Sequence, residues 1–298
     1  MFILKPIVHE TVWGGSKLTK YSGSDCQKIG HLYSAIDNKS LTNIIATGVN
    51  KGKTLHDWFI ANRSRYGLDK FDEVPVLMAL VEAADNLSIQ VHPDDKMAAE
   101  YVGKEFGKNE SFFLIEPPTT GCIYNGCTVK SVEAMSKLIA DGKTMEGVDT
   151  LPVQAGDYIY ITGGTLHAAS AGSLSFEIEE NCDATYRFYD FDRLDKNGQK
   201  RPLQVEKALK CLHPDFKSEI KHYTPGQSIE ERMYWTKLCL NADEVENKTD
   251  MFVFAVVLKG VFTLEGYLMQ PGTCVVLEPG NKFNAAGADI MLAAPKAK

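Results

Sequence analysis

Gln90 and His92 are the first residues of this chain whose types and spacing point to chemistry. They lie two positions apart in residues 87–95 (LSIQVHPDD), where apolar and polar residues alternate as in a β-strand. Side chains at positions i and i+2 of a strand point to the same face. An amide oxygen and an imidazole would therefore face one spot, which is half of a metal site.

Two later segments offer partners for this half-site. Residues 107–111 (GKNES) supply a carboxylate at Glu110, and residues 163–168 (GGTLHA) supply a second imidazole at His167. These side chains are far apart along the chain, so only the fold can bring them together.

The elements that must position these residues are mostly short strands. Runs rich in β-branched and aromatic residues alternate with Gly, Pro, Asn and Asp turn signals. Strands are predicted near residues 87–91, 111–115, 158–162, 174–178 and 185–189, and helices at 54–66, 93–102, 131–140 and 203–212. This distribution favours a mainly β fold, a jelly-roll barrel with a few helices. Inward-facing side chains from several strands converge in such a barrel.

The pattern near the end of the chain predicts a separate domain. Residues 251–258, 261–264, 274–277 and 289–293 are strand-like runs joined by glycine turns. The polar, turn-rich segment 225–231 is the expected boundary. We therefore expect a metal-binding domain with helical insertions at 1–225 and a small all-β, cupin-like domain at 226–298.

Composition narrows the function classes. The net charge of −7 argues against a nucleic-acid or anionic-membrane binder but allows a phosphorylated small molecule. No apolar run approaches the roughly 18 residues of a membrane span, and the start lacks a secretory signal. Seven scattered cysteines without a C-x-x-C pair indicate reduced thiols, so we expect a cytoplasmic protein.

Five segments together carry a family resemblance. They are residues 12–18 (VWGGSKL), 88–95 (SIQVHPDD), 107–110 (GKNE), 164–168 (GTLHA) and 183–193 (DATYRFYDFDR), the last running on into 200–203 (KRPL). In this order and spacing the chain resembles the short bacterial form of type I mannose-6-phosphate isomerases, which are zinc-dependent cupin enzymes. The resemblance spans most of the chain.

The resemblance implies a metal site and a catalytic arginine. The implied ligands are His92, Glu110 and His167, with Gln90 as a fourth, and the implied cofactor is one Zn²⁺ per chain. Nitrogen and oxygen ligands without a thiolate also suit Mn²⁺ or Co²⁺. Arg187 is the implied catalytic arginine, placed to stabilise an enediolate or to grip phosphate.

Further roles follow from the same resemblance. Lys108, two residues before Glu110, is assigned contact with substrate or phosphate. Glu177 and Asp183 match acidic positions of the family, and either could shuttle or orient protons. The sequence does not identify the base. The remaining histidines, at 9, 31, 56, 213 and 222, are expected to be structural or surface residues, and Trp13 a core residue.

The chain also departs from the family pattern. Residues 30–35 (GHLYSA) stand where relatives usually carry Gly-Glu-x-Trp-Glu-x-Ser, and residues 74–80 (VPVLMAL) lack the lysine often found there. Residues 111–113 (SFF) replace Cys-Trp-Tyr, and 162–164 (TGG) replace a Pro-Ala-Gly or Pro-Ser-Gly turn. The ligand set and Arg187 are retained, so an assembled site is expected, while the exact sugar phosphate stays open.

We therefore expect an aldose–ketose isomerase that interconverts mannose 6-phosphate and fructose 6-phosphate through an enediol or enediolate. The alternative is a catalytically weakened cupin that binds a sugar phosphate as a sensor or regulator. A cupin oxygenase using Fe²⁺ is less favoured, because Gln90 replaces the first histidine of the usual His-x-His cluster. The expected partner is a sugar phosphate, with no nucleic acid and no membrane, and the protein is expected to be a monomer or homodimer.

Overall fold

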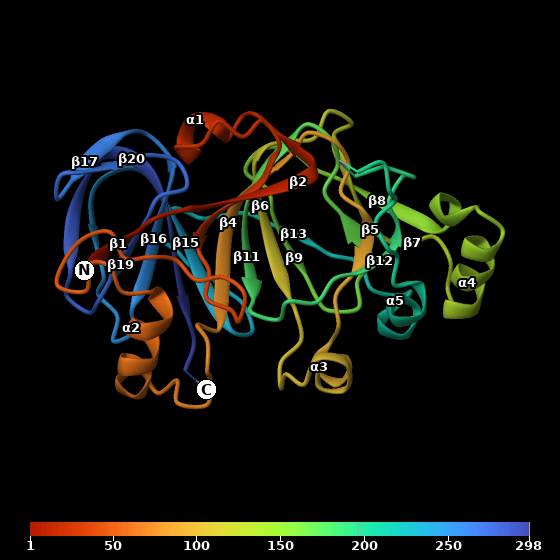
Figure 1. Cartoon of the computed structure of the whole chain (residues 1–298), viewed down its shortest axis with the longest axis horizontal. Coiled ribbons are helices and arrows are strands. Elements are labelled where there is room, and N and C mark those ends of the chain that lie inside the picture. The colour runs from red at the N-terminus through yellow and green to blue at the C-terminus, as the bar shows by residue number, and fades with distance from the viewer. Residues whose placement is uncertain (196, 298) are drawn as a thin grey trace.

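The computed structural model describes residues 1–195 and 197–297. Two β-rich bodies lie side by side along the long axis, with the C-terminal strands (blue) at one end and the helix α4 at the other (Figure 1). Among the described residues, the strands form a seven-stranded, a five-stranded and a six-stranded sheet and one isolated hairpin. The predicted mainly β architecture is thereby confirmed.

The seven-stranded and five-stranded sheets are both antiparallel and make up the barrel. The order of the seven-stranded sheet is β13 (Ile220–Lys221), β9 (Tyr158–Ile161), β6 (Glu110–Glu116), β11 (Ser173–Glu180), β4 (Val76–Ala83), β3 (Ile29–Ala35) and β2 (Ile7–Gly15). The order of the five-stranded sheet is β12 (Tyr186–Tyr189), β5 (Ile89–Val91), β10 (His167–Ala168), β7 (Cys122–Cys127) and β8 (Val148–Pro152).

The six-stranded sheet consists mainly of C-terminal residues. Its order is β1 (Phe2–Leu4), β19 (Cys274–Leu277), β16 (Val253–Lys259), β20 (Lys282–Pro295), β15 (Tyr234–Glu246) and β14 (Ile229–Glu230), and β17 (Phe262–Leu264) pairs with β18 (Tyr267–Met269) as a hairpin. The first strand of the chain thus joins the last ones, with Ile3 opposite Val275. The division at residue 225 stays a prediction, and a fragment ending there would leave β1 without its partner strand.

Strand β4 explains how the two bodies pack. All its residues are buried, and they alternate between two apolar cores. Met78 and Leu80 pack in one core with Phe254 of the six-stranded sheet. Ala79 and Val81 pack in the other core, inside the barrel. A strand buried on both faces needs a continuous apolar run, which is what residues 76–81 provide.

The predicted helices are confirmed, and most begin at a capping residue. The helices are α1 (Thr19–Ser22), α2 (Leu55–Asn62), α3 (Asp95–Val102), α4 (Val132–Ala140) and α5 (Val205–Cys211), with short 3₁₀ turns η1 (Arg63–Tyr66) and η2 (Thr144–Gly147). Thr54 caps α2 in a capping box with Asp57, and Asp94 and Ser131 cap α3 and α4. None of the described helices combines the length and apolar character needed to cross a bilayer.

Candidate metal centre and active site

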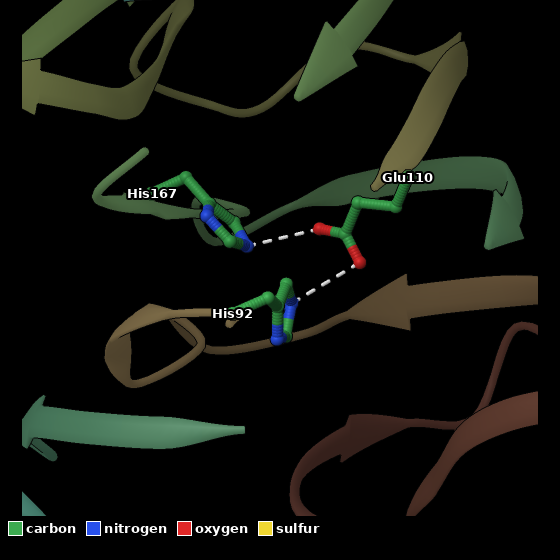
Figure 2. A group of neighbouring side chains, drawn as sticks. All are labelled: His92, Glu110 and His167. Carbon is green, nitrogen blue, oxygen red and sulfur yellow. Dashed lines mark ion pairs between the residues drawn. The ribbon is translucent and has the colours of Figure 1, made fainter. Parts of the chain in front are cut away.

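His92, Glu110 and His167 meet inside the barrel. The Glu110 carboxylate points one oxygen at each imidazole, with Oε2 3.2 Å from His92 Nε2 and Oε1 2.9 Å from His167 Nε2 (Figure 2). All three side chains are buried. One potential ligand atom from each lies within 4.8 Å of the others, so a single ion could contact all three.

The strand register explains this meeting. In the five-stranded sheet, Gln90 of β5 lies directly opposite His167 of β10 on one side and Arg187 of β12 on the other. In the facing seven-stranded sheet, Glu110 is the first residue of β6 and lies opposite Glu179 of β11. Directly opposed residues share a face of the sheet. Two inward faces of the barrel therefore bring the imidazoles and the carboxylate together.

The hydrogen bonds of the Nδ1 atoms of His92 and His167 fix the tautomer of each ring. His92 Nδ1 lies 2.9 Å from the carbonyl oxygen of Ala184, and His167 Nδ1 lies 2.9 Å from that of Thr165. A carbonyl oxygen only accepts, so each Nδ1–H donates. In a neutral imidazole this leaves the Nε2 lone pair facing Glu110, the tautomer that metal-binding histidines use.

The two Nε2 atoms and the Glu110 carboxylate therefore point lone pairs at one another. Burial, with a further contribution from Lys108, lowers the pKa of His92 to about 4, which keeps its ring neutral near pH 7. Neither His92 Nε2 nor Glu110 Oε1 has a hydrogen-bond partner among the residues that the structure describes, although both atoms are buried. Lone pairs of two nitrogens and a carboxylate repel unless a cation lies between them. The donor set thus fits a divalent metal ion.

Gln90, the predicted fourth ligand, lies beside this group. Its amide nitrogen is 3.5 Å from His167 Nε2, and its amide oxygen accepts a hydrogen bond from Ser88 at 3.2 Å. Ligation through oxygen requires a half-turn of the amide about its terminal bond. The role of Gln90 as a ligand stays a prediction.

A cavity of about 130 Å³ adjoins the metal-ligand group. Its lining includes Gln90, Lys108, Glu110, Glu177 and Arg187 from the sequence prediction. Most of the predicted site thus surrounds one space. Asp183 differs from these residues, because its side chain is exposed and it is not one of the lining residues.

Lys108 brings a fixed positive charge to this cavity. Its ammonium lies 2.5 Å from Glu179 Oε2 and 3.4 Å from Glu110 Oε2. Burial alone would lower the pKa of Lys108, but the two carboxylates outweigh burial and raise it. Glu179 was missed by the sequence analysis. Its two-residue spacing from Glu177 on one strand was the signal that could have identified it.

Arg187 is a guanidinium without a carboxylate partner among residues 1–195 and 197–297. It lines the cavity, and its buried Nε has no hydrogen-bond partner. Arg201 lines the same cavity, but Asp190 holds it through two contacts of 2.7 and 2.6 Å. Burial and the nearby Arg201 lower the pKa of Arg187. A negatively charged ligand would offset both the burial of the guanidinium and its repulsion by Arg201, because it would stabilise the charged form of Arg187.

Glu177 is a buried carboxyl group on the same cavity wall. Burial, Glu110 and Glu179 raise its pKa well above the usual range, and Ser175 donates a hydrogen bond to it at 3.0 Å. A carboxyl group whose pKa is raised in this way is a candidate for giving and taking a proton.

His31, in the altered segment 30–35, forms another part of the wall. His31 and Tyr33 stack with their rings parallel at 5.2 Å, and Trp13 packs edge-on against His31 at 5.2 Å. Trp13 is buried, as predicted, and it also lines the cavity with His9 and His31. Both histidines line the cavity, although the sequence predicts structural or surface positions for them. The alternation of His31 and Tyr33 in a strand is the signal that could have identified His31.

The chain is similar to known mannose-6-phosphate isomerases in sequence and in fold. Residues 1–110 match the family model for the catalytic domain of type I phosphomannose isomerase. The chain is 35% identical over 211 residues to the mannose-6-phosphate isomerase of Streptococcus mutans, a match that covers 70% of this chain and 66% of that protein, just under two thirds.

Two Bacillus subtilis comparisons extend this likeness. Mannose-6-phosphate isomerase ManA is 30% identical over 233 residues, which is 78% of this chain and 74% of that protein. The crystal structure of the mannose 6-phosphate isomerase from the same organism superposes with a TM-score of 0.84 at 26% identity, covering 98% of both chains.

The donor set predicts that Glu110→Gln weakens metal binding without unfolding the protein. We expect the dissociation constant for Zn²⁺, measured by competition with a chromophoric chelator, to rise at least about a hundredfold, beyond the effect of changing a residue that only supports a ligand. Glu116→Gln is the matched control, because Glu116 ends the same strand and is exposed. Equal affinities for the two variants would contradict the ligand role of Glu110.

Proposed function

The chain belongs to the type I mannose-6-phosphate isomerase family, and on this premise we propose that it interconverts mannose 6-phosphate and fructose 6-phosphate through an enediol or enediolate. The observation that carries the proposal is the cavity that Lys108, Glu177 and Arg187 line together with Glu110 of the His92–Glu110–His167 group. A metal-ligand set beside two cations and a carboxyl group of raised pKa suits this reaction.

The isomerisation moves a proton between C1 and C2 of the sugar and a hydrogen between the two attached oxygens. Such a carbon acid is very weak without assistance. We propose that the resident ion is Zn²⁺, held by His92, Glu110 and His167 with Gln90 as the fourth ligand. When bound, the ion supplies Lewis-acid polarisation of the substrate oxygens.

The two cations of the cavity have separate tasks in this proposal. Lys108 is tied to Glu179 and Glu110, so its charge stays at one place beside the reacting oxygens. Arg187 has no carboxylate partner in the described part of the chain and can engage an anion with two parallel hydrogen bonds. It therefore stabilises negative charge on the enediolate or grips the phosphate.

The proton carrier in the proposal is Glu177. Its carboxyl group lines the cavity, whereas Asp183 is exposed. Ala79 lies beside Glu177 in the sheet, in the strand that lacks the family's lysine, with Tyr33 on its other side. No cation on that strand therefore favours the ionised form of Glu177. The sensor alternative draws its support from the same change.

The partner, the oligomeric state and the location of the protein are also proposals. The partner is a sugar phosphate, and the protein acts as a monomer or homodimer without nucleic acid or membrane. A cytoplasmic location is proposed because the seven cysteines are free and the substrate is a phosphorylated metabolite.

A coupled assay tests the function directly. Metal-replete protein is expected to form fructose 6-phosphate from mannose 6-phosphate, and chelator is expected to abolish turnover until Zn²⁺ is restored. Saturable binding of mannose 6-phosphate with no turnover would instead support the sensor alternative.

Arg187→Ala is expected to lower kcat by about 10²–10³-fold, the loss seen when one donor to a developing oxyanion is removed. Metal content should stay the same, because Arg187 is not a ligand. Lys200→Ala serves as the control, since Lys200 is an exposed cation nearby on the chain. Near-normal kcat for Arg187→Ala, measured by steady-state kinetics, would reject the role.

Glu177→Gln and Asp183→Asn separate the two acidic candidates. Glu177→Gln is expected to lower kcat by about 10²–10⁴-fold and to remove one limb of the pH–rate profile. Asp183→Asn is expected to leave kcat and both limbs of the pH–rate profile unchanged. The assignment fails if the profiles of the two variants are the same as that of the unmodified protein.

A further inference from the structure

Both sequence neighbours of Glu110 are anchored on the side of the strand away from the cavity. Successive side chains of a strand point to opposite faces, so Asn109 and Ser111 point away from the metal-ligand group. Within the described part of the chain, the ion pairs of the Glu110 carboxylate are with His92, His167 and Lys108. Its position therefore depends on how the flanking backbone is held.

Asn109 joins two ligand segments. Its amide nitrogen donates to Glu180 Oε2 at 2.9 Å, and its amide oxygen accepts from the backbone N–H of Gly163 at 2.7 Å. Gly163 begins the turn that leads to His167. The Asn109 side chain is buried and so is Glu180, which places the whole link out of water.

Arg232 completes this link from the C-terminal side. Its guanidinium forms two hydrogen bonds with the Glu180 carboxylate, one of them 3.0 Å from Nε to Oε1. The same guanidinium contacts both oxygens of Asp95 at 2.7 Å, and Asp95 accepts the backbone N–H of Gly107 at 2.8 Å. One arginine thus holds both Glu180 and the segment that precedes Glu110.

Tyr234 anchors the other neighbour. Its hydroxyl bonds to Ser111 Oγ, which is also 2.6 Å from the hydroxyl of Tyr158. Tyr234 is fully buried and is the first residue of β15 in the six-stranded sheet. Arg232 and Tyr234, two positions apart, therefore secure the residues on either side of Glu110.

We propose that Arg232 and Tyr234 are positioning residues through which the C-terminal sheet orients the metal ligand Glu110. This rests on the metal centre of the proposed function. None of the described residues beyond Arg201 lines the cavity, so the C-terminal sheet acts on the site only through such links. A ligand held to within about 0.5 Å requires support of this kind.

The test compares Zn²⁺ affinity with the stability of the metal-free protein. Removing Arg232 alone would leave the Glu180 charge buried without its partner, so the variants are Tyr234→Phe and the double variant Arg232→Met, Glu180→Gln. We expect the dissociation constant for Zn²⁺, from competition with a chromophoric chelator, to rise about tenfold in each. Arg232→Lys is expected to recover part of the lost affinity.

Two control variants remove comparable contacts elsewhere. Tyr223→Phe removes a tyrosine hydrogen bond of 2.7 Å to Thr236, and Arg65→Met removes an ion pair of 3.1 Å with Glu278. Neither contact touches the neighbours of Glu110. The controls are expected to bind Zn²⁺ as the unmodified protein does, and the thermal midpoints of the metal-free test and control variants are measured beside the affinities.

Two results would overturn the positioning role. One is unchanged Zn²⁺ affinity in both test variants while the unmodified protein binds the ion. The other is an equal loss of affinity in the controls, which would make the effect one of general stability. Absence of Zn²⁺ binding in the unmodified protein is a distinct result, which would reject the metal centre and this inference with it.

Discussion

The site depends on a repulsion between the lone pairs of His92, His167 and Glu110, which the fold holds close together. Two carbonyl oxygens take the outer N–H groups of His92 and His167, so both inner nitrogens turn their lone pairs toward the Glu110 carboxylate. All three side chains are buried, so bulk water does little to screen that contact. A divalent cation would convert the repulsion into coordination, and the rest of the barrel holds the three donors where one ion could meet them.

The seven-stranded sheet connects this centre to the remainder of the molecule. One face of β4 packs against the six-stranded sheet, while the other faces the barrel interior. Two hydrogen bonds cross the same boundary: Arg232 donates to Glu180 of β11, and the Tyr234 hydroxyl bonds to Ser111 of β6, the strand that carries Glu110. The C-terminal sheet is thus a backing layer for the site, although it contributes no side chain to the described cavity lining.

Much of the fold was predictable because local signals and burial agree. Helices α2, α3 and α4 begin at polar capping residues, and the strands follow apolar runs between turn signals. The placement of Glu179 and His31 was not predicted, because each lies on a strand where only the register shows its neighbours. Asp183 and Glu177 matched the family equally well, and only burial distinguishes them.

The sequence by itself determined the element types, the family and the identities of the candidate ligands, since these follow from residue patterns along the chain. It could not decide which atoms face one another. Three features depend on contacts between distant segments. They are the tautomers of His92 and His167, the pairing of Lys108 with Glu179, and the anchoring of Glu110 by Arg232 and Tyr234. Such contacts arise only when strand register and sheet packing bring those segments within bonding distance.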